Sequence, residues 1–107
     1  MRRVAQVIRV RPERVGEYEQ VHSAVWPSVL ETLRRHHVTN YSIYRHGDLL
    51  FSYLEYTGDD YEADMAAVAA DPETGRWWQV TDPMQEPVAE ASDGEWWHPI
   101  PEVFHLD

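Results

Sequence analysis

Apolar residues recur at every second position in three stretches of the chain, which is the period of a β-strand with one buried face. In the first stretch, residues 2–10, Val4 and Ile8 lie on the same face. The other two stretches are residues 39–45 and 49–56, and the His-Gly-Asp sequence between them is typical of a tight turn. The pattern therefore predicts one strand, followed later by a β-hairpin.

Elsewhere apolar residues recur every three to four positions, which predicts helices. The first helix is expected to begin at Pro12 and to end near His36. Pro27 lies inside it and removes a backbone hydrogen bond, so we expect a bend or break just before this residue. The Gly58–Asp60 segment is expected to cap a second helix, and Asp71-Pro72 to end it and open a short third one.

The C-terminal part of the chain has a weaker pattern. Residues 86–101 are polar and interrupted by proline, which indicates a loop or a dimer arm, and Val103–Leu106 is expected to form a last short strand. The order strand, helix, strand, strand, helix, strand is that of the ferredoxin-like α+β fold, βαββαβ. Helices cover one face of such a sheet, and a second copy usually buries the other. We therefore expect a single domain over residues 1–107 and a homodimer.

Composition narrows the range of partners. The formal net charge of −10 at pH 7 argues against nucleic acid and anionic membranes, since both need a basic surface, and fits a neutral or cationic small ligand better. Cysteine is absent, which excludes disulfides, thiol chemistry and Cys-ligated zinc. The N-terminal residues alternate instead of forming a signal peptide, and no apolar stretch has the length of a membrane span. We expect a cytoplasmic protein.

The histidines do not form a metal-binding pattern. His36 and His37 are neighbours that point apart on a helix, and no other pair has the spacing of two ligands on one strand or helix. No carboxylate-rich loop has calcium-site spacing, and the five glycines are spread singly, so there is no phosphate-binding loop. We therefore expect neither a metal nor an organic cofactor.

Three ring-bearing residues lie four positions apart in the first helix: Tyr18, His22 and Trp26. Residues at this spacing lie on one face, which amphipathic helices normally fill with aliphatic side chains. Histidine exchanges a proton near neutral pH, and tyrosine donates or accepts a hydrogen bond, so the column is a candidate acid–base site. The same spacing also fits rings that only close the rim of a core, and the sequence alone leaves both interpretations open.

Tyr41 shares a face of the hairpin with Ile43. If this face is turned toward the first helix, the Tyr41 phenol approaches His22. If the face is turned away, Tyr41 belongs to a dimer interface. The strand pattern does not decide between these two arrangements.

Two tryptophan pairs complete the candidates. Trp77 and Trp78 are expected to point roughly 100° apart on a helix, so one can enter the core while the other lines a cleft. Indoles in a cleft commonly hold the apolar face of a sugar, although both residues could simply anchor the core. For Trp96 and Trp97, packing onto a partner subunit is the favoured interpretation.

Five segments containing these residues follow one another along the chain. They are Tyr18-x-x-x-His22-x-x-x-Trp26-Pro27, Asn40-Tyr41-x-Ile43-Tyr44, Leu49-Leu50-Phe51-x-Tyr53-x-Glu55, Arg76-Trp77-Trp78 and Glu102-Val103-Phe104-His105-Leu106. In order and spacing they resemble the L-rhamnose mutarotase family, and the resemblance covers nearly the whole chain. Each segment alone is a weak signal, whereas their combination is specific.

The resemblance implies a dimeric α/β-barrel, in which two ferredoxin-like sheets pack face to face. It also implies interconversion of the α and β anomers of L-rhamnose without a metal or an organic cofactor. By the same resemblance His22 is the proton-transferring residue, and the sugar contacts are Tyr18, Tyr41, Trp77 and Trp78.

The chain departs from this family pattern in two places. Residues 79–84 look shortened, and residues 95–99 resemble an insertion. Loops in these places shape a pocket, so L-fucose or another deoxyhexose stays open as the substrate.

Two other functions stay open. Dimeric α/β-barrels with His and Trp in the pocket also resemble cofactor-free monooxygenases of aromatic polyketides. A non-catalytic small-ligand-binding dimer is the third interpretation, and it predicts that His22 is buried and hydrogen-bonded with no cavity beside it. A polar pocket bounded by Tyr18, His22, Tyr41 and a tryptophan would count against this third interpretation.

Overall fold

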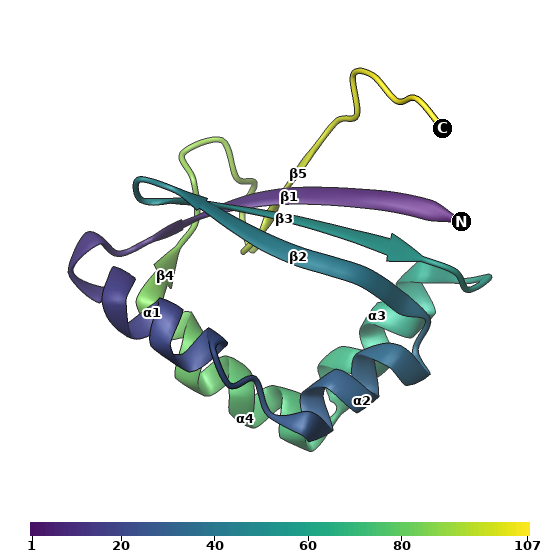
Figure 1. Ribbon diagram of the computed structural model, residues 1–107, viewed down its shortest axis with the longest axis horizontal. Coiled ribbons are helices and arrows are strands. Elements are labelled where there is room, and N and C mark those ends of the chain that lie inside the picture. The colour runs from purple at the N-terminus through teal and green to yellow at the C-terminus, as the bar shows by residue number, and fades with distance from the viewer.

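The structure is a curved antiparallel sheet with four helices against one of its faces, as seen in the computed structural model of residues 1–107 (Figure 1). The strands are β1 Arg2–Val10, β2 Val38–His46, β3 Leu49–Tyr56, β4 Gln85–Glu86 and β5 His98–Ile100. They run in the order β2-β3-β1-β4, and β5 also pairs with β1. Helices connect β1 to β2 and β3 to β4, so the predicted ferredoxin-like α+β fold is confirmed.

Buried and less buried side chains alternate along the strands, and the buried ones mark the face of the sheet that the helices cover. Every second residue of β3 is buried, and Leu50 and Leu54 are among them. Leu50 joins Ile8 and Val10 of β1 in one buried cluster, to which the first helix contributes Tyr18. The apolar face expected from the sequence is therefore the helix-covered face, and Tyr18 packs against it.

The break expected before Pro27 is present. The helices are α1 Val15–His22, α2 Pro27–Arg35, α3 Tyr61–Ala70 and α4 Pro72–Thr81, with short 3-10 turns at Pro12–Arg14 and Asp82–Met84. Trp26 is extended, with φ −61° and ψ 132°, because a residue before proline is disfavoured in helical geometry. As a result α1 ends at His22 and presents that imidazole on its last turn. None of the helices combines the length and the apolar composition that a membrane crossing requires.

Two aspartates begin the later helices, as the sequence predicts. A carboxylate oxygen of Asp60 accepts a hydrogen bond from the Ala63 backbone N–H at 3.1 Å, which caps α3. Asp71 caps α4 in the same way through the Thr74 N–H, at 2.9 Å. The second cap fixes the start of the helix that carries Trp77.

The expected last strand at Val103–Leu106 is wrong. Residues 101–107 have no regular secondary structure, and the strand that pairs with Ala5–Val7 of β1 is β5, inside the segment expected to be a loop or arm. Pro101 directly follows β5 and has no N–H to donate, so the ladder ends there. Residues 87–97 lie outside helices and strands, which confirms the loop for that part.

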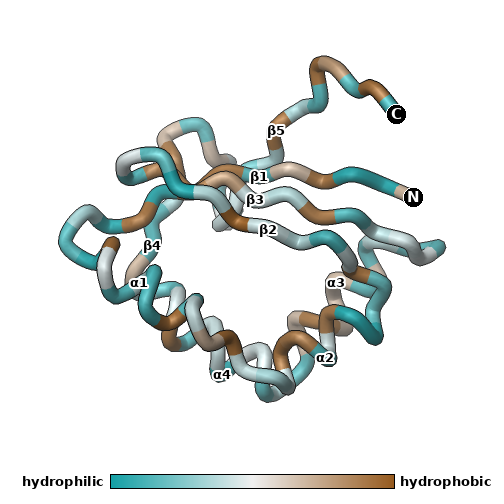
Figure 2. Tube along the Cα trace, viewed as in Figure 1, coloured by the Kyte–Doolittle hydropathy of each residue, from teal (hydrophilic) through white to brown (hydrophobic).

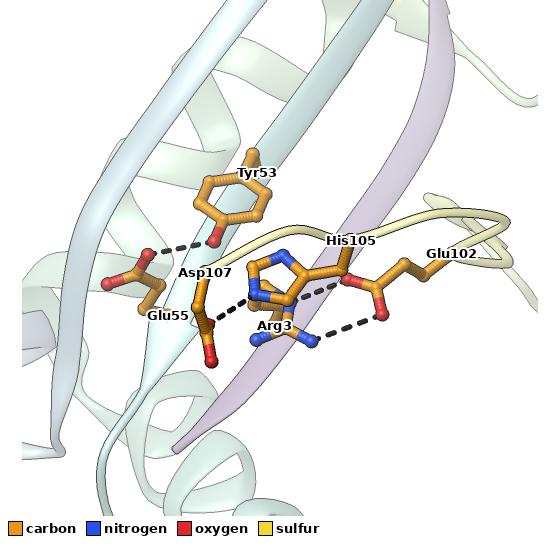
Figure 3. A network of polar contacts seen from close by, with 6 residues as sticks. All are labelled: Arg3, Tyr53, Glu55, Glu102, His105 and Asp107. Atoms are coloured by element: carbon orange, nitrogen blue, oxygen red, sulfur yellow. Dashed lines mark hydrogen bonds and ion pairs between the residues drawn. The ribbon is translucent and has the colours of Figure 1, made fainter.

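Side chains rather than a ladder hold the tail that follows. The Arg3 Nε donates to a Glu102 carboxylate oxygen at 2.6 Å, on the sheet face opposite the helices, and Tyr53 donates to Glu55 nearby at 2.8 Å (Figure 3). The apolar side chains of the tail stay outside, since Val103 is 94% exposed and Phe104 79%. Figure 2 shows this run of hydrophobic residues beyond β5.

Candidate active site

A cavity of about 850 Å³ lies between the sheet and the helices. The residues that the sequence analysis singled out as catalytic or sugar-binding all line it: Tyr18, His22, Tyr41, Trp77 and Trp78. Tyr18 and His22 of α1 and Gln85 of β4 bring hydrogen-bonding groups to its lining. Leu33, Val38, Leu54 and Met65 bring aliphatic side chains from α2, β2, β3 and α3. The lining of the cavity is therefore mixed, with polar and apolar side chains.

Tyr41 is turned toward the helices, which decides the question that the strand pattern left open. Val38, Tyr41 and Ile43 all line the cavity, although strict alternation would put Val38 and Tyr41 on opposite faces. A register shift between Thr39 and Ser42 accounts for this, because such a bulge adds one residue to β2. The extra residue is accommodated at Asn40, whose φ of 47° lies in the left-handed region.

The imidazole of His22 has a defined tautomer. Its Nδ1 lies 2.9 Å from the backbone carbonyl oxygen of Tyr18, one helical turn earlier. A carbonyl oxygen can only accept, so Nδ1 carries the proton and Nε2 keeps a free lone pair. Burial lowers the pKa of His22, and the hydrogen bond to the carbonyl only partly opposes this. At neutral pH His22 is therefore an uncharged base.

Aromatic rings fix the position of this imidazole. Tyr18 stacks on His22 with ring centroids 4.1 Å apart and an interplanar angle of 27°. The ring of Trp77 meets His22 edge-on, with centroids 5.4 Å apart. Trp26 does not line the cavity but packs against Trp77 at 5.2 Å, so it supports the site from behind. The column seen in the sequence thus separates into two cavity residues and one packing residue.

The two phenols are close enough to influence each other. Tyr18 is 3% exposed, and burial raises its pKa, to which the nearby Tyr41 phenol adds. Tyr41 is 42% exposed as a whole, and partial burial raises the pKa of Tyr41 to about 12. Both phenols therefore keep their protons at neutral pH and can donate hydrogen bonds.

Trp77 and Trp78 on α4 point in different directions, as adjacent residues of a helix do. Trp77 is 6% exposed and belongs to the core, whereas Trp78 is 39% exposed at the cavity. The expectation that one indole enters the core and the other lines a cleft is confirmed. Both indoles contribute apolar surface to the lining of the cavity.

Sequence reasoning missed three polar residues of the cavity. Gln85, on β4, donates from its Nε2 to the Tyr18 hydroxyl at 3.2 Å. The indole N–H of Trp96 donates to the Gln85 Oε1 of the same chain at 3.0 Å, and the expected packing of Trp96 onto a partner subunit stays a prediction. Asp82 also lines the cavity, and partial burial raises its pKa. Neither a motif nor a period signals these residues, because only the path of the chain after α4 brings them to the site.

The site offers a neutral imidazole, two protonated phenols and two indole faces around one cavity. Such a set can move a proton within a neutral polar ligand and hold that ligand by its apolar face. Nowhere in the structure do three His, Cys, Asp or Glu side chains gather in an arrangement that could hold a metal ion. The cavity beside His22 counts against the non-catalytic interpretation, which predicted none.

The chain is similar to curated proteins over its whole length. A sequence model described as L-rhamnose mutarotase matches residues 3–106. Curated relatives named L-rhamnose mutarotase include those of Opitutus terrae, 36% identical, and Phocaeicola vulgatus, 33% identical, each with full coverage of both chains.

Two solved structures share the fold. The L-rhamnose mutarotase of Formosa agariphila superposes with a TM-score of 0.80 at 20% identity, and tetracenomycin F2 cyclase of Streptomyces glaucescens with 0.70 at 14%, each covering both chains fully. At these identities they support the fold alone, whereas the sequence matches extend to the family. These matches favour the mutarotase interpretation over the monooxygenase one. The chain belongs to the L-rhamnose mutarotase family.

Proposed function

We propose that this protein interconverts the α and β anomers of L-rhamnose, or of a related deoxyhexose, by acid–base ring opening. The observation that carries the chemical part of the proposal is the neutral His22, whose Nδ1 is engaged by a backbone carbonyl while Nε2 is free. The family match over residues 3–106 supports the reaction class. The cavity, with both polar and apolar side chains in its lining, supports a neutral polyhydroxylated substrate.

The proton balance of mutarotation needs only one such group. The Nε2 of His22 accepts the proton of the anomeric hydroxyl, and the imidazolium delivers a proton to the ring oxygen as the bond from C1 to that oxygen breaks. The open-chain aldehyde rotates about C1–C2, and closure on the other face reverses the two transfers. No net proton, electron or water is consumed.

The other cavity residues position the sugar in this proposal. Tyr18 and Tyr41, both protonated, donate hydrogen bonds to the region of the anomeric and ring oxygens. Trp77 and Trp78 hold the apolar face of the ring and the C6 methyl group, as indoles do with sugar C–H groups. A substrate without that methyl group leaves part of the indole surface uncovered.

Exchange NMR tests the function directly. Saturating the anomeric proton of one L-rhamnose anomer transfers saturation to the other at a rate that the enzyme should increase strongly. The same measurement on L-fucose and D-sugars shows whether the methyl group and ring configuration are selected. If catalytic amounts of the protein leave the L-rhamnose exchange rate at its spontaneous value, the proposal is wrong.

The proposal includes a homodimer formed through the sheet face opposite the helices. The apolar tail supports this arrangement, because Phe104 is 79% and Leu106 81% exposed in the single chain. Analytical ultracentrifugation should find a dimer for the wild type and a shift toward monomer for Phe104→Asp. Ser28→Asp, on the exposed side of α2, adds the same charge elsewhere and should leave the dimer intact. A monomeric wild type at micromolar concentration would contradict the arrangement.

A further inference from the structure

A chain of two hydrogen bonds links the loop after β4 to the site. Trp96, in this loop, donates its indole N–H to the Gln85 Oε1 at 3.0 Å, and the Gln85 Nε2 donates to the Tyr18 hydroxyl at 3.2 Å. Gln85 is 3% exposed, so water does not compete for its amide. The loop thereby reaches a residue that faces the substrate.

The chemistry of the three groups decides which atom donates and which accepts in each of these two hydrogen bonds. An indole N–H can only donate, so the amide oxygen of Gln85 must face Trp96 and its NH₂ must face Tyr18. That NH₂ can only donate in turn, so the Tyr18 oxygen accepts and its own proton points away from Gln85. Tyr18 lines the cavity, so an acceptor for this proton can lie there.

We propose that Gln85 and Trp96 are positioning residues that hold the Tyr18 hydroxyl as a hydrogen-bond donor toward the substrate. The inference rests on the proposed mutarotase function and extends it to residues that do not touch the reacting atoms. Without the Trp96 N–H, the Gln85 amide can turn over and place its oxygen against Tyr18. The phenol then donates to Gln85 and offers the sugar only a lone pair.

The location of the pair bears on substrate choice. Trp96 lies in the segment at residues 95–99, where the sequence departs from the pattern of the family it resembles. A phenol fixed as a donor selects an acceptor, such as the ring oxygen, at one place in the sugar. The segment that looks like an insertion therefore sets the polarity of one hydrogen bond in the site.

Removing the indole N–H of Trp96 tests whether this group sets the direction of the hydrogen bond between Gln85 and Tyr18. Trp96→Phe keeps a ring in place, and we expect kcat for L-rhamnose exchange to fall about tenfold, which is the lower end for misdirecting one oriented donor. In a Tyr18→Phe background the same change should have no further effect, because its target is already gone. Glu95→Gln is the matched loop control, since it alters contacts to Ser92 and His98 but not to Gln85, and should leave kcat unchanged.

Gln85→Glu reverses the bond by a change of nearly equal shape. The introduced carboxylate accepts from both Trp96 and Tyr18, and so draws the phenol proton away from the cavity. When this carboxyl group is protonated, it donates to Tyr18 as the amide does. The activity of Gln85→Glu relative to wild type should therefore rise as the pH falls, which a merely structural role of Gln85 does not predict.

An NMR measurement of the indole N–H keeps the test independent of catalysis. In Gln85→Leu the Trp96 indole resonance should move and its hydrogen exchange should accelerate. If this resonance does not change, if Trp96→Phe keeps wild-type kcat, or if Glu95→Gln is equally impaired, the positioning role is overturned. A wild type that does not accelerate L-rhamnose exchange would instead overturn the function itself, so the two failures are distinguishable.

Discussion

Two helix ends carry a histidine with the same local hydrogen bond, and only one of them lies at the cavity. His22 at the end of α1 donates to the Tyr18 carbonyl at 2.9 Å, and His36, just after α2, to the Thr32 carbonyl at 2.7 Å. Both imidazoles therefore carry the proton on Nδ1. What separates them is the surroundings, because His22 lies between two aromatic rings at the cavity and His36 does not line it. The backbone sets the tautomer, and the packing decides whether the free nitrogen has a substrate to act on.

The largest expected difference between the two ends is catalytic. His22→Ala should lower kcat for L-rhamnose exchange by about 10²–10⁴-fold, the usual contribution of a general acid–base group. His36→Ala removes an imidazole with the same backbone bond and should keep wild-type kcat. Exchange NMR on both purified variants, with circular dichroism to verify folding, measures this. If both variants lose the same amount of kcat, the two histidines do not differ in function and His22 is not the acid–base group.

The aromatic surroundings of His22 should also matter for stability. Trp77→Ala removes a nearly buried indole that contacts both His22 and Trp26, and should lower the free energy of unfolding by roughly 3–5 kcal/mol. Trp78→Ala removes the more exposed neighbour and should mainly raise KM. Denaturant titrations and exchange kinetics of the two variants give the comparison. If Trp78→Ala is the more destabilising change, the division between core and cavity indole is wrong.

The pH dependence should reveal the state of His22. Because burial lowers its pKa below the ordinary value of about 6.5, the base form persists to lower pH, and the acid limb of kcat should lie below that value. The folded state binds this proton less readily than the unfolded state, so the free energy of unfolding falls as the pH drops from about 6.5 through the folded pKa. His22→Ala should reduce that fall in stability, whereas His36→Ala should leave the acid limb of kcat in place. An acid limb above pH 7 would contradict the burial argument.

The smallest expected difference concerns the hydrogen bond that the two histidines share. Each alanine variant loses one side-chain donor to a backbone carbonyl, and each should lose about 0.5–1.5 kcal/mol of unfolding free energy. His22→Ala loses the stacking with Tyr18 in addition, so its loss should be slightly greater. Urea unfolding of both variants tests this. A large gap between them would mean that the backbone bonds are not equivalent.

The sequence predicts those features of this molecule that depend on neighbouring residues. Periodicity locates β1, the hairpin and the helices, Pro27 locates the break in the first helix, and Asp60 and Asp71 locate two helix starts. These features depend on local sterics and caps, which a short window contains. The helical spacing of Tyr18 and His22 likewise places them side by side.

The features that the sequence did not predict depend on distant parts of the chain. Residues 98–100 pair with β1, and residues 103–106 do not. This choice depends on the path that brings the chain to β1, and on Pro101, which ends the ladder. The direction of Tyr41 depends on the bulge in β2, and nothing in its own segment fixes that. Gln85 and Trp96 meet only because the chain after α4 returns to the site, so neither residue belongs to a recognisable motif.

The bulge in β2 affects which single-residue deletions in this strand leave the cavity wall unchanged. If the codon of Asn40 were lost, Val38 and Tyr41 would be two positions apart and would face the same side of a regular strand. Loss of a codon elsewhere in β2, with the bulge retained, would exchange the two faces for every residue on one side of the deletion. The left-handed residue at Asn40 therefore marks a place where length variation between relatives is compatible with an unchanged cavity wall.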